Sequence, residues 1–342
     1  MSSTRPCPNP TRRALLAGAL ALAGAPCLPA RAQSIQLGTP IRFGILPIGG
    51  TVDSRNGWAP VLAELGQAIG RPVTLLSATS YDMLEQALRR DEVDMAFLSG
   101  KMALDAVTQR GMRVIAQVAR HDGLPGYRAT LLARSGGPVP SLDAVLANPG
   151  KWRLARGEKR SLSGFIVPKL ELFLPRGIDI ETSFAGGAVG THQQTALAVA
   201  NGEAELATNN TADFERFNLV FPAEAARLTV LWQSDLIPHG AIVIRRGYDG
   251  ALRERVQQFF WQYGRGRGRR AEQQRQTLKA LHDFAGFPAA DNRALIPVAR
   301  LTHKLELDSA RSAQWINEAA RQARLARIDS EYAEQLRALQ AE

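Results

Sequence analysis

Short apolar segments alternate with longer segments of helical periodicity through the first third of the chain, and this alternation restricts the fold more than any other feature. Apolar runs of strand length are found at residues 41–47, 72–76 and 93–98. Apolar side chains at helical spacing lie between and after these runs, over residues 58–69, 83–88 and 103–108. Strands that alternate with helices predict βαβ units, so we expect an α/β fold with a parallel sheet covered on both faces.

The carboxyl ends of these predicted strands form the expected ligand-binding edge. In open α/β sheets, ligands bind outside the carboxyl ends of the strands. Here those ends are residues 47–52, 77–81 and 98–101.

A second set of strand patterns predicts a second lobe. Residues 127–133 read as a strand leaving the first lobe, and further strands are expected at residues 152–155, 180–184, 204–208 and 228–231. The chain then returns through residues 234–240 into an apolar strand at residues 241–245. Two crossings between lobes make a hinge, which suits closure on a ligand. The expected division is therefore lobe 1 at residues 33–133 and 235–307, lobe 2 at 134–234, and a C-terminal helix at 308–342.

The C-terminal helix is predicted from apolar residues at roughly helical spacing between Trp315 and Leu339. We expect one long helix from Asp308 to Ala341. An apolar stripe of this length needs a packing partner. Two partners remain open, the first lobe and a second copy of the chain in a homodimer.

Residues 1–32 have the pattern of a cleaved export signal. Arg5, Arg12 and Arg13 precede an apolar segment at residues 14–25, which is too short to span a bilayer, and residues 30–32 form an A-x-A cleavage site. Cleavage is expected before Gln33. Thr11-Arg12-Arg13-Ala14-Leu15-Leu16 is similar to a twin-arginine signal, although an ordinary secretory leader also carries adjacent arginines.

Composition excludes several classes of function for the mature chain. Both cysteines, Cys7 and Cys27, lie in the leader, so neither a disulfide nor a cysteine metal site is expected after cleavage. The histidines lack metal-ligand spacing, and no cofactor is expected. The net charge is +10 for the full sequence and +6 for residues 33–342, but the one arginine cluster, at residues 265–270, lacks the interleaved aromatic residues of a nucleic-acid surface.

Two potential oxyanion sites lie between residues 157 and 213. Ser161-Leu162-Ser163-Gly164 and Gly190-Thr191-His192 each stand immediately before an apolar helical pattern. A helix start has unpaired N–H groups and partial positive charge, so it can hold an anion. Ordinary helix caps are the simpler interpretation of either segment alone. A nucleophile–base pair of Ser163 and His192 is a further alternative, but no third residue that would orient the histidine is apparent.

Several sequence runs occur in the order found in one known family. These runs are Asp122-Gly123-Leu124-Pro125-Gly126-Tyr127, Ser161-Leu162-Ser163-Gly164-Phe165-Ile166-Val167-Pro168, Ala196-Leu197-Ala198-Val199-Ala200-Asn201, Ala207-Thr208-Asn209-Asn210-Thr211 and Leu236-Ile237-Pro238. Through them, nearly the whole mature chain resembles the periplasmic phosphonate-binding receptors of ABC transporters. The resemblance implies a two-lobed type II periplasmic binding protein fold with a C-terminal helical extension.

The resemblance also implies a set of ligand-binding residues, with several departures from the family pattern. The residues that it implies are Tyr81, Ser161, Ser163, Gly164, His192 and Asn210. The family's central threonine and second tyrosine are replaced by Leu162 and Leu98, and the glutamate after the histidine is Gln193. Ala212 and Gly240 stand where aminoethylphosphonate receptors place carboxylates for the ligand's ammonium group. A buried ammonium without a partner is costly, so these two replacements argue against an aminophosphonate ligand.

The expected function is that of a periplasmic receptor and not of an enzyme. It would capture a phosphonate, phosphite or related small oxyanion between its lobes and deliver it to an ABC permease. A ligand sensor for a membrane kinase, or an enzyme on the same fold, are the alternatives. No metal and no nucleic-acid partner are expected.

Overall fold

The computed structural model describes residues 38–46 and 51–341 of the 342-residue chain. The predicted export signal, the cleavage site before Gln33 and residues 47–50 of the first predicted strand end lie outside the described residues. No helix in the described part combines the length and apolar character needed to cross a bilayer.

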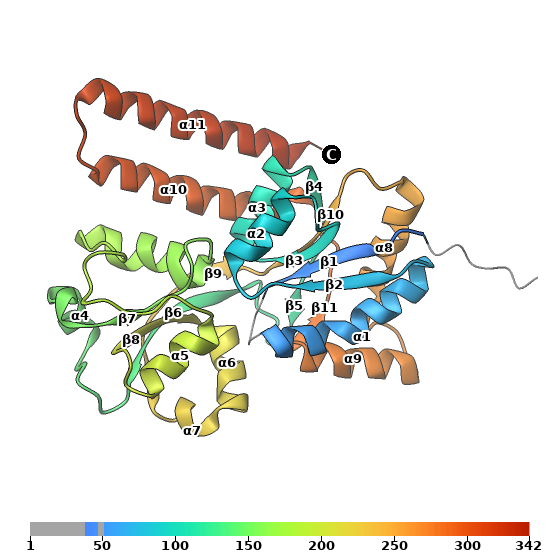
Figure 1. Cartoon of the computed structure of the whole chain (residues 1–342), viewed down its shortest axis with the longest axis horizontal. Helices are drawn as coiled ribbons and strands as arrows, with labels where there is room; N and C mark the ends of the chain where they lie inside the picture. Colours follow the sequence, from blue (N-terminus) through green and yellow to red (C-terminus); the bar gives the residue numbers. More distant parts are fainter. Residues whose placement is uncertain (1–37, 47–50, 342) are drawn as a thin grey trace, which may run out of the picture. The chain divides into compact units, whose positions relative to one another are not determined.

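Lobe 1 is built on a five-stranded sheet with the order β2-β1-β3-β10-β4 (Figure 1). Its strands are β1 (Ile41–Ile45), β2 (Val73–Ser77), β3 (Met95–Leu98), β4 (Met112–Gln117) and β10 (Ala241–Arg245). The first three are parallel and are connected through α1 (Thr51–Ile69) and α2 (Tyr81–Arg89), as the alternating pattern predicts. β10 is antiparallel to both β3 and β4, so the sheet is mixed and not purely parallel.

Alternate residues of these strands face two separate cores. Phe43 and Phe97 pack with Trp58 of α1 and with helices α8 (Gly250–Gln262) and α9 (Arg269–Ala280). Ala96 and Leu98 face the other way, toward α2 and α3 (Gly100–Gln109). The two-residue period of a strand thus sends neighbouring side chains of β3 to opposite faces of the sheet.

Lobe 2 is built on a four-stranded sheet with the order β7-β8-β6-β9. Its strands are β6 (Gly126–Arg134), β7 (Leu154–Ala155), β8 (Leu206–Asn210) and β9 (Leu228–Pro238). β6 pairs with β9 from Gly126–Pro238 to Arg134–Leu228. The strand predicted at residues 127–133 therefore belongs to this sheet, and the predicted lobe boundaries at 133/134 and 234/235 fall inside β6 and β9. Sequence periodicity does not reveal which strands pair. The pairing of β6 with β9 places both crossing segments in the sheet of lobe 2.

The strand predicted at residues 180–184 is absent, and the segment forms turns instead. The Asp179 carboxylate accepts hydrogen bonds from the backbone N–H groups of Glu181 and Thr182, at 2.7 and 3.0 Å. A side chain that satisfies the backbone of the next residues favours a turn over an extended strand.

Lobe 2 also contains several helices that surround its sheet. These are α4 (Leu142–Ala147), α5 (His192–Ala200), α6 (Thr211–Val220), α7 (Pro222–Ala225), the 3₁₀ turns η1 (Pro149–Lys151) and η4 (Leu174–Arg176), and the π-helical segments η2 (Leu162–Ile166) and η3 (Pro168–Phe173).

A short two-stranded sheet pairs β5 (Ala119–Arg120) with β11 (Phe284–Gly286), and the 3₁₀ turn η5 (Asn292–Leu295) follows β11 in the chain.

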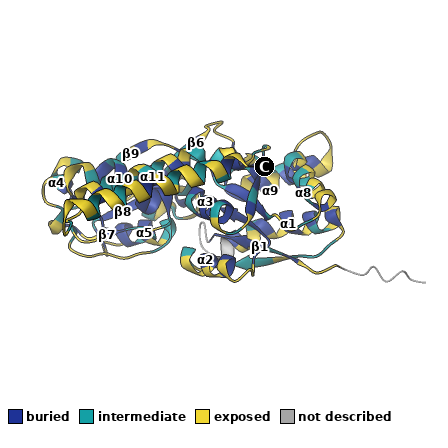
Figure 2. Cartoon of the chain, turned by 90° about the horizontal axis from the view of Figure 1, so that it is seen from above, coloured by how far each residue is buried: buried dark blue, intermediate teal, exposed yellow. Residues whose placement is uncertain are grey.

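The C-terminal segment is a hairpin of two helices, so the prediction of one helix from Asp308 to Ala341 is wrong. α10 (Ile296–Ser312) and α11 (Glu318–Gln340) lie side by side (Figure 1). α10 ends at Ser312, where Ala313 is extended, and the Asn317 side chain caps the start of α11 by accepting a hydrogen bond from Ala320 N. α10 contacts α3 of lobe 1 as well as η3 and β9 of lobe 2. α11 is largely exposed (Figure 2), and only Ile328 and Leu339 are buried among its described residues.

Candidate functional site

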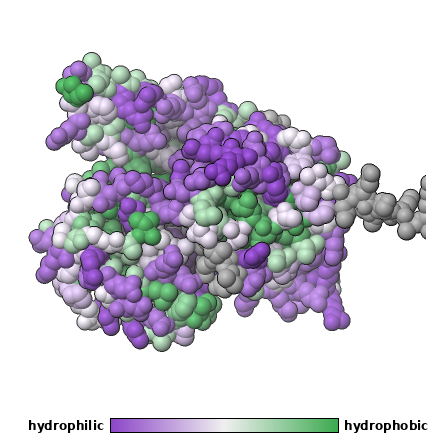
Figure 3. All heavy atoms as spheres, in the orientation of Figure 1, coloured by the Kyte–Doolittle hydropathy of each residue, from purple (hydrophilic) through white to green (hydrophobic). Residues whose placement is uncertain are grey.

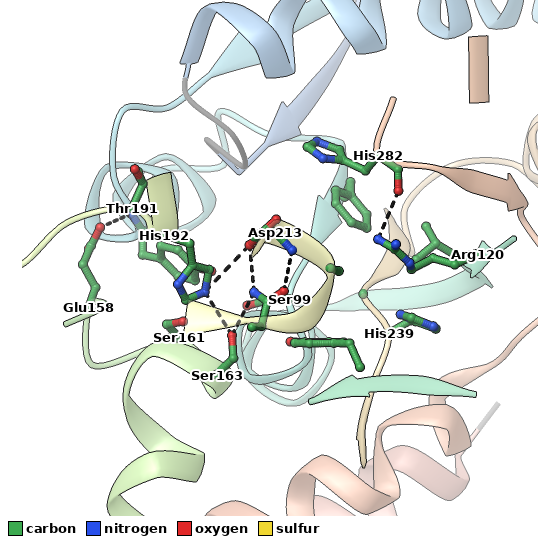
Figure 4. Close-up of a pocket in the computed structure, with 18 of the residues that line it drawn as sticks. Ser99, Arg120, Glu158, Ser161, Ser163, Thr191, His192, Asp213, His239 and His282 are labelled. Atoms are coloured by element: carbon green, nitrogen blue, oxygen red, sulfur yellow. Dashed lines mark hydrogen bonds and ion pairs between the residues drawn. The ribbon is translucent and has the colours of Figure 1, made fainter. Parts of the chain in front are cut away.

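A cavity of about 100 Å³ lies between the two sheets, with walls from both lobes (Figure 4). A single buried water needs about 10–15 Å³ of such space, so the cavity suits a small molecule. Five of the six predicted binding residues line it, namely Tyr81, Ser161, Ser163, His192 and Asn210. They come from the start of α2 in lobe 1 and from three helix starts in lobe 2.

The three helix starts of lobe 2 converge on one side of the cavity. Ser161 caps η2 by accepting a hydrogen bond from Gly164 N at 3.0 Å. Thr191 caps α5 in a capping box with Gln194, which places His192 in the first turn. Asn210 caps α6 through a 2.8 Å bond from Asp213 N. The convergence concentrates positive helix ends and polar side chains, which is an environment for an anion.

Gly164, the sixth predicted residue, lies behind this wall and does not line the cavity. Its N–H already donates to Ser161 Oγ, so it has no donor left for a ligand. Its carbonyl accepts hydrogen bonds from Gly157 N at 3.1 Å and from Thr208 Oγ1 at 2.7 Å. Pro168, four residues later, lacks the N–H that would bond this carbonyl in a regular helix, which leaves the carbonyl to these partners. Gly164 therefore supports the wall.

Ser163, His192, Asn210 and Asp213 form one buried polar network. Ser163 Oγ lies 3.0 Å from His192 Nε2 and accepts a 3.3 Å hydrogen bond from Asn210 Nδ2. Asn210 Nδ2 also donates to Asp213 Oδ2 at 2.8 Å. Asp213 Oδ2 is 3.8 Å from His192 Nε2, the same nitrogen that faces Ser163. In a catalytic triad the acid contacts the other ring nitrogen, so this arrangement does not orient His192 as a base toward Ser163.

The surroundings of His192 shift the pKa of its imidazole in both directions, and burial has the largest effect. Burial lowers the pKa of His192, while the Asp213 carboxylate and the Thr208 backbone act in the opposite direction. The net effect lowers this pKa, so the imidazole is a neutral hydrogen-bonding group at pH 7. An anion placed beside it would favour the protonated form, because opposite charges raise the pKa of a base.

Two tyrosines extend the polar wall. Burial raises the pKa of Tyr81 to about 12, and the hydroxyls of Ser161 and Ser99 lie close enough to oppose this shift. Burial also raises the pKa of Tyr127, which the Ser163 hydroxyl opposes. Both phenols thus stay neutral donors. Sequence reasoning missed Tyr127 as a site residue, although it ends the run from Asp122 to Tyr127 that carries the family resemblance.

Leu98 and Leu162, which replace polar residues of the family, do not make the cavity wall apolar. Both are buried in the core between the sheet and its helices. The alternation of β3 turns Phe97 toward the cavity and Leu98 away from it. The apolar wall is formed by Phe97, Val118 and Phe284.

Phe97 explains why residue 240 is glycine. A Cβ atom at Gly240 would stand 2.7 Å from the Phe97 ring and 2.8 Å from the Leu98 carbonyl oxygen. The ring therefore packs against the position where a side chain at residue 240 would begin. The Phe97 ring thus occupies the space that a side chain at residue 240 would need.

Glu158 and Arg160 connect lobe 2 to the start of α2 in lobe 1. The Glu158 carboxylate accepts hydrogen bonds from the backbone N–H groups of Tyr81 and Asp82, at 3.0 and 3.2 Å. Arg160 forms an ion pair with Asp82. The helix start that carries Tyr81 is thereby capped by an anion from the opposite lobe, and the two lobes are linked beside the cavity.

A second polar cluster, formed by Arg120, His239 and His282, lies on the other side of the cavity from Ser161, Ser163 and His192 (Figure 4). Arg120 is 6% exposed and bonds Glu215 of α6 at 2.5 Å, which ties lobe 1 to lobe 2 a second time. Sequence reasoning missed this cluster, as well as Asp213 and Glu158, because its members are far apart in the chain and belong to no common motif.

Comparison with known proteins identifies related chains. The family model described as ABC transporter, phosphonate, periplasmic substrate-binding protein matches residues 43–295. The chain is 28% identical over 291 residues to the phosphonates-binding periplasmic protein of Escherichia coli (strain K12), covering 85% of this chain and 84% of that protein.

Solved structures show the same architecture. A binding protein component of an ABC phosphonate transporter from Pseudomonas aeruginosa has a TM-score of 0.80 and 29% identity, over 87% of this chain and 97% of that chain. PhnD1 from Prochlorococcus marinus, in complex with methylphosphonate, has a TM-score of 0.66 and 16% identity, over 78% and 98% of the two chains. These similarities confirm the predicted two-lobed α/β periplasmic binding fold.

Proposed function

This chain belongs to the family of periplasmic phosphonate substrate-binding proteins of ABC transporters, and from its cavity we propose that its ligand is a phosphonate, phosphite or related small oxyanion with an uncharged tail. The family consists of transport receptors, which confirms the expected role as a binding protein and not an enzyme. Delivery of the ligand to an ABC permease follows from membership of the family.

One observation carries the proposal about the ligand. Ser161, Ser163, His192 and Asn210 from lobe 2 and Tyr81 from lobe 1 all face one cavity, although they come from distant parts of the chain. Hydroxyl, imidazole and amide groups donate hydrogen bonds to oxyanion oxygens, and bonds to a charged acceptor are stronger than neutral ones. Tyr127 adds a further neutral phenol to the same wall.

The residues at positions 212 and 240, which the family resemblance assigns to binding an ammonium group, carry no carboxylate here, and this supports an uncharged tail. Glu158 lines the cavity, but its carboxylate already accepts hydrogen bonds from the backbone N–H groups of Tyr81 and Asp82. Ala212 lines the cavity without a polar group, and Phe97 fills the space beside Gly240. Asp213 does face the cavity, but its Oδ2 atom is bonded to Asn210 and lies near His192, at the end where the oxyanion would bind. An ammonium-bearing tail would therefore lack the pair of carboxylates found in aminoethylphosphonate receptors.

We propose hinge closure as the mechanism of capture. The oxyanion would contact Tyr81 of lobe 1 together with Ser163 and His192 of lobe 2, and a ligand that touches both lobes favours the closed state. The links of Glu158 and Arg160 to α2, and of Arg120 to Glu215, form only when the lobes are close. The permease would recognise this closed form.

A thermal melt screen tests the proposed ligand class. The test compounds are phosphite, methylphosphonate, longer alkylphosphonates, aminoethylphosphonate, sulfonates and small carboxylates. A ligand at 100 times its dissociation constant stabilises the folded state by about 2.7 kcal/mol, which a melt readily detects. We expect alkylphosphonates or phosphite to give the largest shift. If only carboxylates or uncharged compounds stabilised the protein, the assignment to phosphonates would be wrong.

We also propose export by the N-terminal segment and a mature start at Gln33. The arginine-rich start, the short apolar segment and the A-x-A sequence at residues 30–32 support this proposal, and the family is periplasmic. The twin-arginine route is proposed from Arg12 and Arg13. N-terminal sequencing of protein from the periplasm tests the cleavage site; a retained leader, or a lipid on Cys27, would contradict it.

A further inference from the structure

The side of the cavity that would surround the ligand's tail contains a buried arginine with one unused donor. Arg120 is 6% exposed, and its Nη atoms bond the Glu215 carboxylate at 2.5 Å and the His282 carbonyl at 3.3 Å. Its Nε atom has an ion-pair neighbour, Asp122 Oδ2 at 3.4 Å, but no hydrogen-bond acceptor among the described residues. Buried polar groups are nearly always hydrogen-bonded, so a buried donor beside a ligand cavity needs an explanation.

His282 stands next to this arginine with an unusual backbone. Its φ angle is 129°, and that of the following Asp283 is 55°. Positive φ angles are uncommon for residues other than glycine, and such strain is retained mainly at functional positions. His282 lines the cavity, and its imidazole makes no hydrogen bond to any described residue. The ring can therefore both donate to and accept from a ligand.

His239 completes the cluster with a fixed orientation. Its Nε2–H donates to the Leu124 carbonyl at 3.1 Å, and its ring stacks on Tyr127 at 5.9 Å between centroids. Since Nε2 carries the proton, Nδ1 is the ring's acceptor. The apolar side chains Phe97, Val118 and Phe284 line the same part of the cavity. A ligand tail here would have carbon surfaces around it and donors at its end.

The charges of the cluster select among tail groups. An ammonium would lie beside the Arg120 guanidinium, while Asp122 and Glu215, which pair with that arginine, do not line the cavity. A carboxylate would gain little, because these two acids already neutralise Arg120. A neutral oxygen can accept a hydrogen bond from the Arg120–His282 cluster without adding a charge.

We propose that Arg120 and His282 form a tail subsite that recognises an uncharged oxygen, a hydroxyl or a carbonyl, on the organic part of the ligand. The inference rests on the proposed function, because it assumes that the oxyanion lies at Ser161, Ser163 and His192. It narrows the ligand from simple alkylphosphonates to hydroxyalkyl- or oxoalkylphosphonates.

Ligands with tails of equal length test this subsite in the wild-type protein. Calorimetry would compare propylphosphonate, 2-hydroxyethylphosphonate and 2-aminoethylphosphonate, with phosphonoacetate as the carboxylate. We expect the hydroxyethyl compound to bind about fivefold more tightly than the propyl compound, as one added hydrogen bond provides. Equal or tighter binding of propylphosphonate, or a preference for the amine or carboxylate, would overturn the subsite and leave the proposed function standing. Failure of every phosphonate to bind would overturn the proposed function as well.

Two variants separate the subsite from the ion pair between the lobes. Arg120→Met removes the guanidinium donors, and we expect the affinity ratio of hydroxyethyl- to propylphosphonate to fall to about one. Glu215→Gln is the matched control, because it removes the Arg120–Glu215 ion pair but leaves Nε in place; the fivefold ratio should persist. If Arg120→Met does not fold, His282→Gly replaces it, since glycine readily adopts positive φ and has no side-chain donor. A ratio unchanged in the Arg120 or His282 variant contradicts the assignment.

Discussion

Ser163 is the residue whose removal should affect ligand binding most directly. Its hydroxyl faces both His192 and Asn210, so truncation leaves two buried polar groups and the bound anion short of a partner. We expect Ser163→Ala to weaken binding of the best phosphonate in the melt screen by roughly 1–3 kcal/mol, measured by calorimetry.

Ser141 provides a control for this substitution. Its hydroxyl caps α4 by accepting a hydrogen bond from Ala144 N at 3.2 Å, and Ser141 does not line the cavity. Ser141→Ala should cost about 1 kcal/mol of folding stability and leave ligand affinity unchanged. Equal affinities of the Ser163 variant and the wild type would remove Ser163 from the proposed site.

His282 should make the folded protein sensitive to acid. Burial lowers the pKa of His282 to about 4, well below its ordinary value. The unfolded chain therefore binds this proton at a higher pH than the folded protein does. Stability due to the neutral ring is present above about pH 6.5 and is lost as the pH falls toward 4, by up to about 3 kcal/mol.

Denaturant titrations between about pH 7 and pH 4 measure this loss. His282→Asn cannot titrate, so its free energy of unfolding should fall less steeply with pH than that of the wild type. His303, which pairs with the exposed Asp329 on the helical hairpin, offers a comparison through His303→Asn. Identical pH profiles for the wild type and the His282 variant would contradict the prediction.

The sequence could predict residues that share a local motif but not those assembled by the fold. Ser161, Ser163 and His192 follow from helix-start patterns and family order. Arg120 and His282 are 162 positions apart and meet only because β5 pairs with β11. Which of Phe97 and Leu98 faces the cavity depends on the register of β3, which an uninterrupted apolar run does not fix.

At the level of the helices, η2 lies so close to the end of β7 that a side chain at residue 164 should not fit. A Cβ atom at Gly164 would lie 2.7 Å from Gly157 Cα and 2.8 Å from Ser161 Oγ. Gly164→Ala must therefore displace the loop that presents Ser161. We expect a loss of about 1–3 kcal/mol in folding stability, together with weaker ligand binding.

Gly150→Ala is the matched control for this prediction. The nearest atom to a Cβ at Gly150 is the Ser183 carbonyl oxygen at 3.6 Å, an ordinary contact. Chemical denaturation should show this variant within about 0.5 kcal/mol of the wild type. If Gly164→Ala kept the stability and the ligand affinity of the wild type, the prediction would be wrong, because the backbone around residue 164 would have to accommodate a Cβ atom.

Element prediction succeeded for most apolar runs and failed where the chain turns within an apolar pattern. The alternation in lobe 1 and the strands at β7, β8 and β9 were found from apolar patterns. The turn after Asp179 and the reversal before Asn317 depend on single side chains that bond the next backbone groups. Such bonds compete with regular structure at positions where apolar spacing alone continues the element.

For the whole molecule, the helical hairpin is the proposed homodimer contact. α11 buries only Ile328 and Leu339 among its described residues, and Ile316 at the turn is 98% exposed. Figure 3 shows a small group of hydrophobic atoms at that end of the hairpin, beside hydrophilic atoms of the same hairpin. We propose that this exposed apolar side chain contacts a second copy of the chain.

Sedimentation of two chains tests the dimer. The mature chain should sediment as a dimer, and a chain truncated after Ser312, which keeps α10 intact, as a monomer. The truncation should also lower the melting temperature, because it removes the Tyr332 ring of α11, which stacks on His303 of α10 with 4.1 Å between the ring centroids. Identical monomer masses for both chains would rule out the homodimer and leave the hairpin as a brace for the lobes.

The position of β10 has a consequence for how the chain acquires its fold. β10 lies between β3 and β4, yet it follows β4 by more than the entire length of lobe 2. Until it arrives, β3 and β4 each present an unpaired edge, and an open edge invites pairing with other chains. Contacts between distant segments form slowly, so lobe 2 should fold first and the insertion of β10 should limit the rate. A nascent chain would thus be most prone to aggregate after β4 has been made and before residue 245 is available.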